Sequence, residues 1–303
     1  MGGHDFESIA ALRRALGAHS PPNTITQEAF DHDAVHLHRL VQLDCGAAAE
    51  PGDLWDYTQD LRYTEIQGPL LVYLLPVCLQ AWHDDLRGAK GFGAFVEHFY
   101  PVLADRHVFD AHLSAQQTAI VSEFMRQSIL HEMNDQRGLA YESMNARPYR
   151  WIGALTTHGV LLPDIDALWT SWWGLATIGR AVSAVQYVSA LLYPNEENPV
   201  FAPWTRDRGG GAPCLWEFKG HLYSHRWLES NVEFLSRTLT VSAVSDVLHR
   251  AVNELTNEPE HQIAARMLAE IPMRGELLAA RCAELPTLLA TTQEPGALLE
   301  WSR

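Results

Sequence analysis

The sequence predicts an all-α protein of 303 residues. Apolar residues recur at helical spacing through most of the chain. The clearest example runs from Ser114 to Asn134, where Ile120, Phe124 and Ile129 lie on one stripe. No segment alternates apolar and polar residues strongly enough to make a sheet central. We therefore expect a multi-helix bundle or an irregular stack of helices, with prolines and glycines between them.

Turn-forming residues bound the helices that we expect in the first half. Pro21 and Pro22 separate the first two, and Asp53 is placed to cap the third. Pro76 is expected to kink the fourth because proline cannot donate the i→i−4 hydrogen bond. Ser114 is expected to cap the last. The expected ranges are 6–16, 26–43, 53–61, 65–86, 95–103 and 114–134.

The segment from Gly138 to Pro148 has the composition of a connector, so we divide the chain into residues 1–140 and 141–303, or treat it as one continuous domain. The second half again shows helical spacing, and it is rich in tryptophan. Its expected helices are residues 149–157, a strongly apolar one that starts at Pro163 and Asp164, then 177–192, 225–237, 241–255, 258–271 and 274–290.

The segment from Tyr193 to Phe218 interrupts this pattern with four prolines and three consecutive glycines. Neither a helix nor a regular strand is expected there. Its aromatic residues favour an ordered, packed loop over a disordered one. Trp204 in this loop is a candidate interface anchor, since tryptophan is favoured in binding hot spots.

The chain is acidic, with 22 basic and 37 acidic residues and a net charge of −15. This sign disfavours nucleic acid as a partner, because nucleic-acid affinity comes largely from neutralised phosphates. Between Glu28 and Asp60 there are eight acids and a single base, Arg39. Such a segment is either a solvated acidic face or a docking surface for a basic protein.

The four cysteines are widely separated and form no CxxC pair, which disfavours zinc fingers and a secreted disulfide framework. The first residues lack the basic start and apolar stretch of a secretory signal. No apolar run is long enough to span a bilayer. We expect a cytoplasmic protein without a cofactor.

Three histidine motifs define an alternative in which the chain is a metal-dependent hydrolase of the HD type. His32 and His36 are spaced i and i+4, with Asp33 between them, so both rings share one helix face. Against this interpretation, surface histidines and polar helix ends account for the same patterns. The candidate ligands are His32, Asp33, His36, His83, Asp84 and His131.

The tryptophans of the second half have two interpretations. They either fill a large core or line a pocket for a small molecule. They are Trp151, Trp169, Trp172, Trp173, Trp204, Trp216 and Trp227.

Residues 50–135 resemble uncharacterised bacterial proteins that are suspected to be immunity or accessory proteins of polymorphic toxin systems. The shared pattern is a helix with a YLLP-type motif followed by a helix with an L-S/T-x-x-Q-x-x-x-V-x-x-F motif. The matching residues are Tyr73, Leu74, Leu75, Pro76, Leu113, Gln117, Val121 and Phe124. The resemblance implies a protein that binds and neutralises a toxin.

Together these observations predict a cytoplasmic, helical, protein-binding regulator of the immunity type. It would act by occluding a basic surface of a toxin or effector, without nucleic acid or membrane. The residues expected to contact this partner are Asp53, Asp56, Asp60, Glu65 and Trp204.

Overall fold

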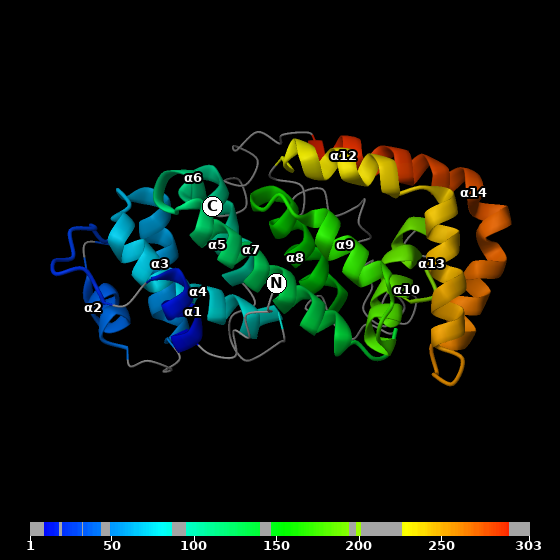
Figure 1. The fold of residues 1–303 in the computed structure, drawn as a ribbon, viewed down its shortest axis with the longest axis horizontal. Helices are drawn as coiled ribbons and strands as arrows, with labels where there is room; N and C mark the ends of the chain where they lie inside the picture. The colour runs from blue at the N-terminus through cyan, green and yellow to red at the C-terminus, as the bar shows by residue number, and fades with distance from the viewer. Residues whose placement is uncertain are drawn as a thin grey trace. The chain divides into compact units, whose positions relative to one another are not determined.

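The computed structural model describes residues 9–17, 20–31, 33–43, 49–86, 95–139, 147–193, 198–200 and 226–290. These residues form 13 α-helices and no strand, which confirms the predicted all-α class (Figure 1). Most of the segment from Tyr193 to Phe218, with Trp204, lies outside the described residues.

The chain divides into two compact units, Met1–Ser128 and Ile129–Arg303. The division falls within helix α7, whereas the sequence places a boundary near residue 140. The two units are described separately below.

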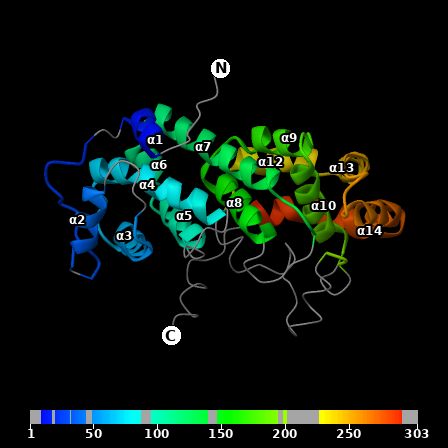
Figure 2. The ribbon, with the colours of Figure 1, turned by 90° about the horizontal axis from the view of Figure 1, so that it is seen from below.

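Helix α4 is the centre of the first unit. It is apolar on most of its surface and packs against α1, α5 and α6, while α3 packs against α2 and α5 (Figures 1 and 2). Pro76 lies inside α4 and is buried there. The helices are α1 (Ile9–Leu16), α2 (Val35–Gln42), α3 (Pro51–Tyr63), α4 (Gly68–Leu86), α5 (Phe95–Asp105), α6 (Val108–His112) and α7 (Ala115–Asn134).

Ser114 caps α7, as the sequence predicts. Its hydroxyl accepts a hydrogen bond from the Gln117 N–H at 3.3 Å, and the Gln117 side chain accepts one from the Ser114 N–H at 2.9 Å. This reciprocal pair satisfies two amides at the helix start. The cap therefore fixes where α7 begins.

The helix expected over residues 26–43 is wrong in its first part, since α2 begins only at Val35. Side chains take the amides that a helix would use. The N–H groups of Thr26 and Gln27 donate to the Gln67 side chain at 2.9 and 3.3 Å. The Phe30 N–H donates to Asp60 at 2.8 Å. These side-chain acceptors replace the backbone carbonyls of a helix.

The expected cap of α3 is also wrong. The helix begins at Pro51, after Glu50, so Asp53 lies within its first turn. Proline suits the first helical position because the amide that it lacks has no partner there in any case.

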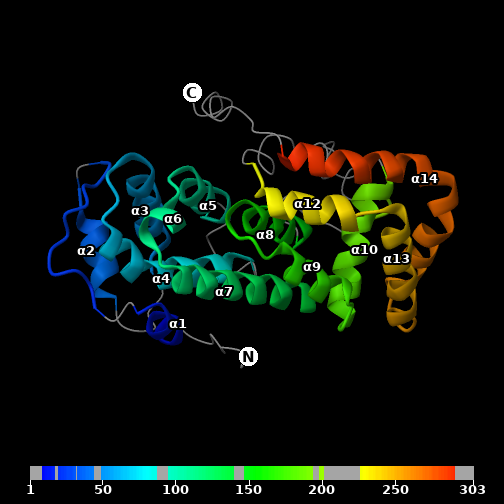
Figure 3. The same cartoon turned by 45° about the horizontal axis from the view of Figure 1, so that its top comes forward.

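Helix α10 is the centre of the second unit. Nearly all of its residues are buried, and it packs against α8, α9, α13 and α14. The α13 helix lies beside one part of α14, and α12 lies beside another part (Figures 1 and 3). The helices are α8 (Arg147–Leu161), α9 (Ile165–Trp173), α10 (Ile178–Leu192), α12 (Glu229–Thr238), α13 (Val241–Glu254) and α14 (His261–Ala290).

The two helices expected over residues 258–271 and 274–290 form one continuous helix, α14, with Pro272 and Pro286 inside it. A proline within a helix costs about 3 kcal/mol. Packing against α10, α12 and α13 along the length of α14 offsets this cost. Proline alone is therefore an unreliable end signal where neighbouring helices support both flanks.

Arginines of α14 cap the C-terminal end of α10. The Arg281 guanidinium donates to the carbonyls of Ala190 at 3.0 Å and Tyr193 at 2.8 Å. The Arg274 guanidinium lies 4.3 Å from the centre of the Tyr193 ring. Cations at a helix C-terminus satisfy carbonyls that have no partner within the helix. The point at which the chain leaves α10 is thereby fixed.

None of the described helices is by itself long and apolar enough to span a membrane. The bent pair of α9 and α10, with 109° between its members, meets the length and composition criteria when the two are taken together.

Gly159 in α8 makes a testable close contact with Trp227. A Cβ at position 159 would lie 2.3 Å from the buried indole ring. We expect Gly159→Ala to destabilise the protein by about 1–3 kcal/mol through overpacking. Gly275→Ala in α14, where a Cβ meets nothing within 4 Å, is the matched control. It should raise stability by up to about 1 kcal/mol. Urea unfolding measures both, and equal effects of the two substitutions would contradict the contact.

Candidate functional site

The carboxylate of Asp60, on α3, joins three parts of the first unit. Its Oδ2 lies 2.6 Å from Nε2 of His36, on α2, and both side chains are almost fully buried. Its Oδ1 accepts the hydrogen bond of the Phe30 amide at 2.8 Å. Asp60 therefore fastens both α2 and the segment before it to α3.

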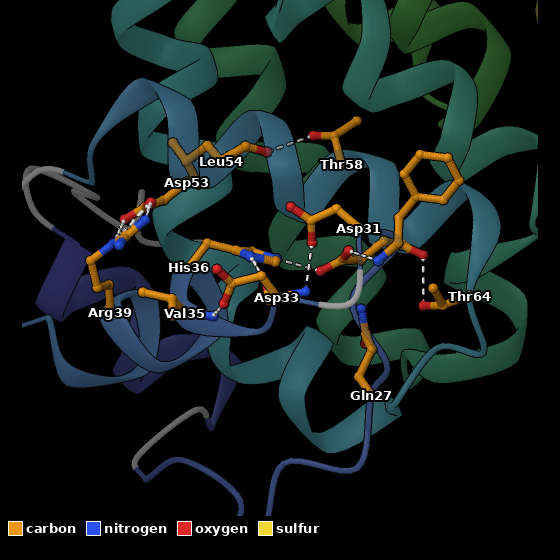
Figure 4. Close-up of polar contacts among 12 residues, drawn as sticks. Gln27, Asp31, Asp33, Val35, His36, Arg39, Asp53, Leu54, Thr58 and Thr64 are labelled. Carbon is orange, nitrogen blue, oxygen red and sulfur yellow. Dashed lines mark hydrogen bonds and ion pairs between the residues drawn. The ribbon is translucent and has the colours of Figure 1, made fainter.

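The second ring nitrogen of His36 also faces an acceptor. Nδ1 lies 3.1 Å from the backbone carbonyl of Asp33 (Figure 4). A carbonyl and an ionised carboxylate both accept, so the ring donates both hydrogen bonds only when each of its nitrogens carries a proton. Burial lowers the pKa of His36, but the hydrogen bond to Asp60 and the charges of Asp60 and Asp56 outweigh it and raise the pKa above its ordinary value. The raised pKa favours the imidazolium, which forms a buried ion pair with the Asp60 carboxylate.

A second ion pair joins the same two helices. Nε of Arg39, on α2, donates to Oδ2 of Asp53, on α3, at 2.9 Å, and Nη2 donates to Oδ1 (Figure 4). The Asp53 side chain is only 8% exposed, whereas that of Arg39 is 56% exposed. This two-point geometry sets the orientation of α2 on α3.

The burial of Asp53 and Asp60 corrects the expectation that both contact a partner. Each carboxylate is paired with a cationic side chain of this protein. Removing either carboxylate would leave that cation without its counter-charge. Of the acids expected at the surface, Asp56 is half-buried and Glu65 is exposed. Trp204 is not among the described residues.

Several large apolar side chains on α2, on α3 and in the segment before α2 are exposed. Phe30 and Tyr63 are 52% and 51% exposed, and their ring centres lie 4.6 Å apart at an angle of 30°. Trp55 and Val35 are 40% and 48% exposed. Trp55, Asp56 and Tyr63 fall within one outward stripe of α3, because their spacing places them on the same side of the helix.

Carboxylates flank these aromatic residues in the chain. We define the acidic aromatic surface as Phe30, Val35, Trp55 and Tyr63 together with Glu28, Asp31, Asp33, Asp56 and Glu65. Asp31 and Asp33 accept hydrogen bonds from nearby backbone amides and shape the turn before α2.

Two arginines near this surface reduce its negative charge. The Arg62 guanidinium lies 5.5 Å from the centre of the Tyr63 ring. Arg106 donates to the carbonyls of Arg62 and Thr64, each at 2.9 Å, and so caps the end of α3. The five carboxylates of the surface outnumber these two cations, so the surface keeps a negative balance.

The histidine motifs are engaged in other contacts where the structure describes them. His32 lies outside the described residues. The Asp33 carboxylate accepts the Val35 N–H at 3.1 Å at the start of α2. Both nitrogens of His36 are committed to Asp33 and Asp60, as described above. A ring that donates both of these hydrogen bonds has no lone pair with which to bind a metal.

The remaining candidate ligands lie on α4 and α7. Nδ1 of His83 lies 3.0 Å from the Ser128 hydroxyl, and the Asp84 carboxylate accepts a hydrogen bond from Gln80 at 3.0 Å. His131 faces Asp135 at 3.8 Å. Across the described parts of the chain, no three His, Cys, Asp or Glu side chains are grouped so that they could hold a metal ion.

The tryptophans of α9 form a core cluster. Trp169, Trp172 and Trp173 are buried and pack edge-on or tilted against one another, and the first two also contact Tyr187. The indole N–H of Trp172 donates to the Ser183 hydroxyl at 2.9 Å. For these three residues the core interpretation is confirmed. Trp227 is buried as well, beside a pocket of about 380 Å³ that α12 lines.

Phe30, Val35, Trp55 and Tyr63 were not among the residues that the sequence predicted for a partner contact. The exposure of Trp55 and Tyr63 could have been predicted from helical spacing. Both fall on the polar side of α3, where a large aromatic residue has no core to fill.

The chain matches no protein-family model, no curated protein and no solved structure.

The two neighbouring aspartates of α3 provide a matched test of the buried ion pair. Asp60→Asn leaves the imidazolium of His36 without its counter-charge, so we expect a loss of about 3 kcal/mol in the free energy of unfolding. Asp56→Asn, one turn away and half-buried, should change stability by about 0.5 kcal/mol or less. Urea unfolding followed by circular dichroism measures both. Losses of equal size would show that the ion pair does not hold the unit together.

Proposed function

We propose that this protein is a protein-binding regulator that neutralises a basic partner by occluding its surface. The acidic aromatic surface is the proposed contact. The observation that carries the proposal is the exposed pair of tilted rings of Phe30 and Tyr63, which lies among carboxylates on helices joined by two ion pairs.

Aromatic side chains supply the anchoring part of such a contact. Tyrosine and tryptophan are enriched among residues whose truncation costs 2 kcal/mol or more, because they bury a large area with few rotatable bonds. The backbone amide of Phe30 donates a hydrogen bond to the Asp60 carboxylate, and its ring packs against Tyr63. This pair of rings therefore loses little conformational entropy when a partner binds.

The carboxylates supply selectivity for a basic partner. Glu28 and Glu65 are exposed, and Asp56 lies on the same stripe of α3 as Tyr63. With a net charge of −15, the whole chain attracts a cationic protein over distances up to about the Debye length, roughly 8–10 Å at physiological salt. Such fields raise association rates and discriminate against acidic partners.

Toxin immunity in the cytoplasm is the specific form of this function that we propose. It rests on the resemblance of residues 50–135 to suspected immunity proteins and on the charge of the chain. Helix α3, which bears Trp55, Asp56 and Tyr63 of the surface, lies within that range. The metal-hydrolase alternative has less support, because the described histidines and aspartates of its motifs already contact other groups of the chain.

The test is an affinity capture from the native host at low salt that compares three baits. One bait carries Phe30→Ala with Tyr63→Ala, and a second carries Glu28→Lys, Asp56→Lys and Glu65→Lys. The third carries Asp246→Lys, Glu254→Lys and Glu276→Lys, three exposed acids of the second unit, and so has the same change in net charge. We expect the third bait to retain a basic partner and the first two to lose it.

Binding kinetics of the purified pair then separate the two contributions. Truncating both aromatic rings should weaken affinity roughly 30-fold or more, mainly through faster dissociation. Reversing the three carboxylates should lower the association rate about tenfold at low salt and flatten its salt dependence. A partner that binds all three baits equally would overturn the assignment of the surface.

A further inference from the structure

We propose that the ring of His36 is a proton-operated latch that holds the segment bearing Phe30 against α3. The proposal is carried by geometry: a buried ring bridges Asp60 to the turn before α2, and the same carboxylate holds the Phe30 amide. The role of the latch in regulating the docking surface rests on the proposed function. The existence of the latch does not depend on that function.

The latch depends on the number of protons that the ring carries. The imidazolium donates from Nε2 to Asp60 at 2.6 Å and from Nδ1 to the Asp33 carbonyl at 3.1 Å. A neutral imidazole has a single N–H. On deprotonation one of these two hydrogen bonds is lost, and the attraction between the ring and the charge of Asp60 is lost with it.

The charged groups around the ring all favour the protonated form or are neutralised nearby. The carboxylate of Asp60 contacts the ring from α3, the charge of Asp56 acts on it from the same helix, and the carbonyl of Asp33 faces it from the preceding turn. Arg39, also on α2, is engaged by Asp53 of α3. Tyr57, which lies near Asp60 on α3, is fully buried and its pKa lies well above the ordinary value, because of burial and nearby charges, so it stays neutral.

The pH range follows from the direction of the His36 shift. Because the pKa of the folded ring lies above the ordinary value of 6.5, the latch contributes fully below pH 6.5 and is lost as pH rises through the folded pKa. The protein should therefore release the Phe30 segment on the alkaline side. The Phe30 amide then exchanges more readily, because Asp60, its acceptor, has lost its cationic partner.

Two measurements on the isolated full-length chain test the latch. The first is an NMR titration of the His36 ring protons, assigned among the 15 histidines by their absence in His36→Gln. The midpoint should lie above 6.5. The second is the protection factor of the Phe30 amide, corrected for the intrinsic exchange rate at each pH. It should fall across that midpoint by up to about tenfold for each pKa unit of the shift.

The Ala243 amide is the matched control, because its acceptor is the neutral hydroxyl of Thr240 in the second unit. Its protection factor should not change with pH. In His36→Gln, the protection of Phe30 should be independent of pH. A midpoint at or below 6.5, or wild-type Phe30 protection that does not change with pH, overturns the latch whether or not the variant folds.

Capture of the partner at pH 6.0 and pH 9.0 separates this inference from the proposed function. If the latch titrates as expected and no basic partner binds at either pH, the proposed function fails and the latch stands. If a partner binds equally well at both pH values while Phe30 is released at the higher one, the latch does not regulate the docking surface.

Discussion

The buried charge of Asp60 is the constraint around which the candidate site is organised. A carboxylate removed from water costs several kcal/mol unless a cation and hydrogen-bond donors compensate it. Helix α3 buries Asp60 and has no cation of its own at that position. The cation comes from His36 on α2, and a further donor comes from Phe30. A segment without regular secondary structure is thereby held on a helix, and its one large aromatic ring is placed at the surface.

The same physical solution recurs at the ends of helices in both units. Arg106 satisfies carbonyls at the end of α3, and Arg281 does so at the end of α10. Arg106 lies in the turn after α5 and Arg281 lies on α14, so each contact both completes a helix end and fixes its position relative to another part of the same unit. These contacts lie where apolar packing ends and backbone groups would otherwise have no partner.

The sequence was sufficient to predict the helices that are defined by local signals. Helix α7 is an example, since an apolar stripe and a capping serine are both readable in the chain. The structure differs from the prediction where groups distant in the sequence determine the backbone hydrogen bonds or support a helix. The amides of Thr26, Gln27 and Phe30 are taken by Gln67 and Asp60, and no local pattern records acceptors so far along the chain. Likewise Pro272 does not end α14, because neighbouring helices support it.

The acidic character of the candidate site could be predicted from the sequence, but the residues that are exposed there could not. The excess of carboxylates between residues 28 and 60 is readable in the sequence and lies in the segment that carries most of the proposed surface. The error was to treat those carboxylates as equivalent. Asp53 and Asp60 share the buried face of α3 with Tyr57 at spacings of four and three residues, a pattern that separates them from Asp56. Periodicity shows which acids face inward, but their cationic partners, Arg39 and His36, emerge only from the packing of α2 on α3.

The contact between Gly159 and Trp227 has a consequence for how the sequence can diverge. Because the indole occupies the volume that a Cβ would need, a side chain at position 159 can be accommodated only if the residue at position 227 becomes smaller or shifts. The carbonyl of Gly159 also accepts the amide of Leu228 at 3.0 Å, so a shift would break a backbone hydrogen bond. In descendants of this chain the two positions are therefore expected to change together, with a gain of volume at one matched by a loss at the other.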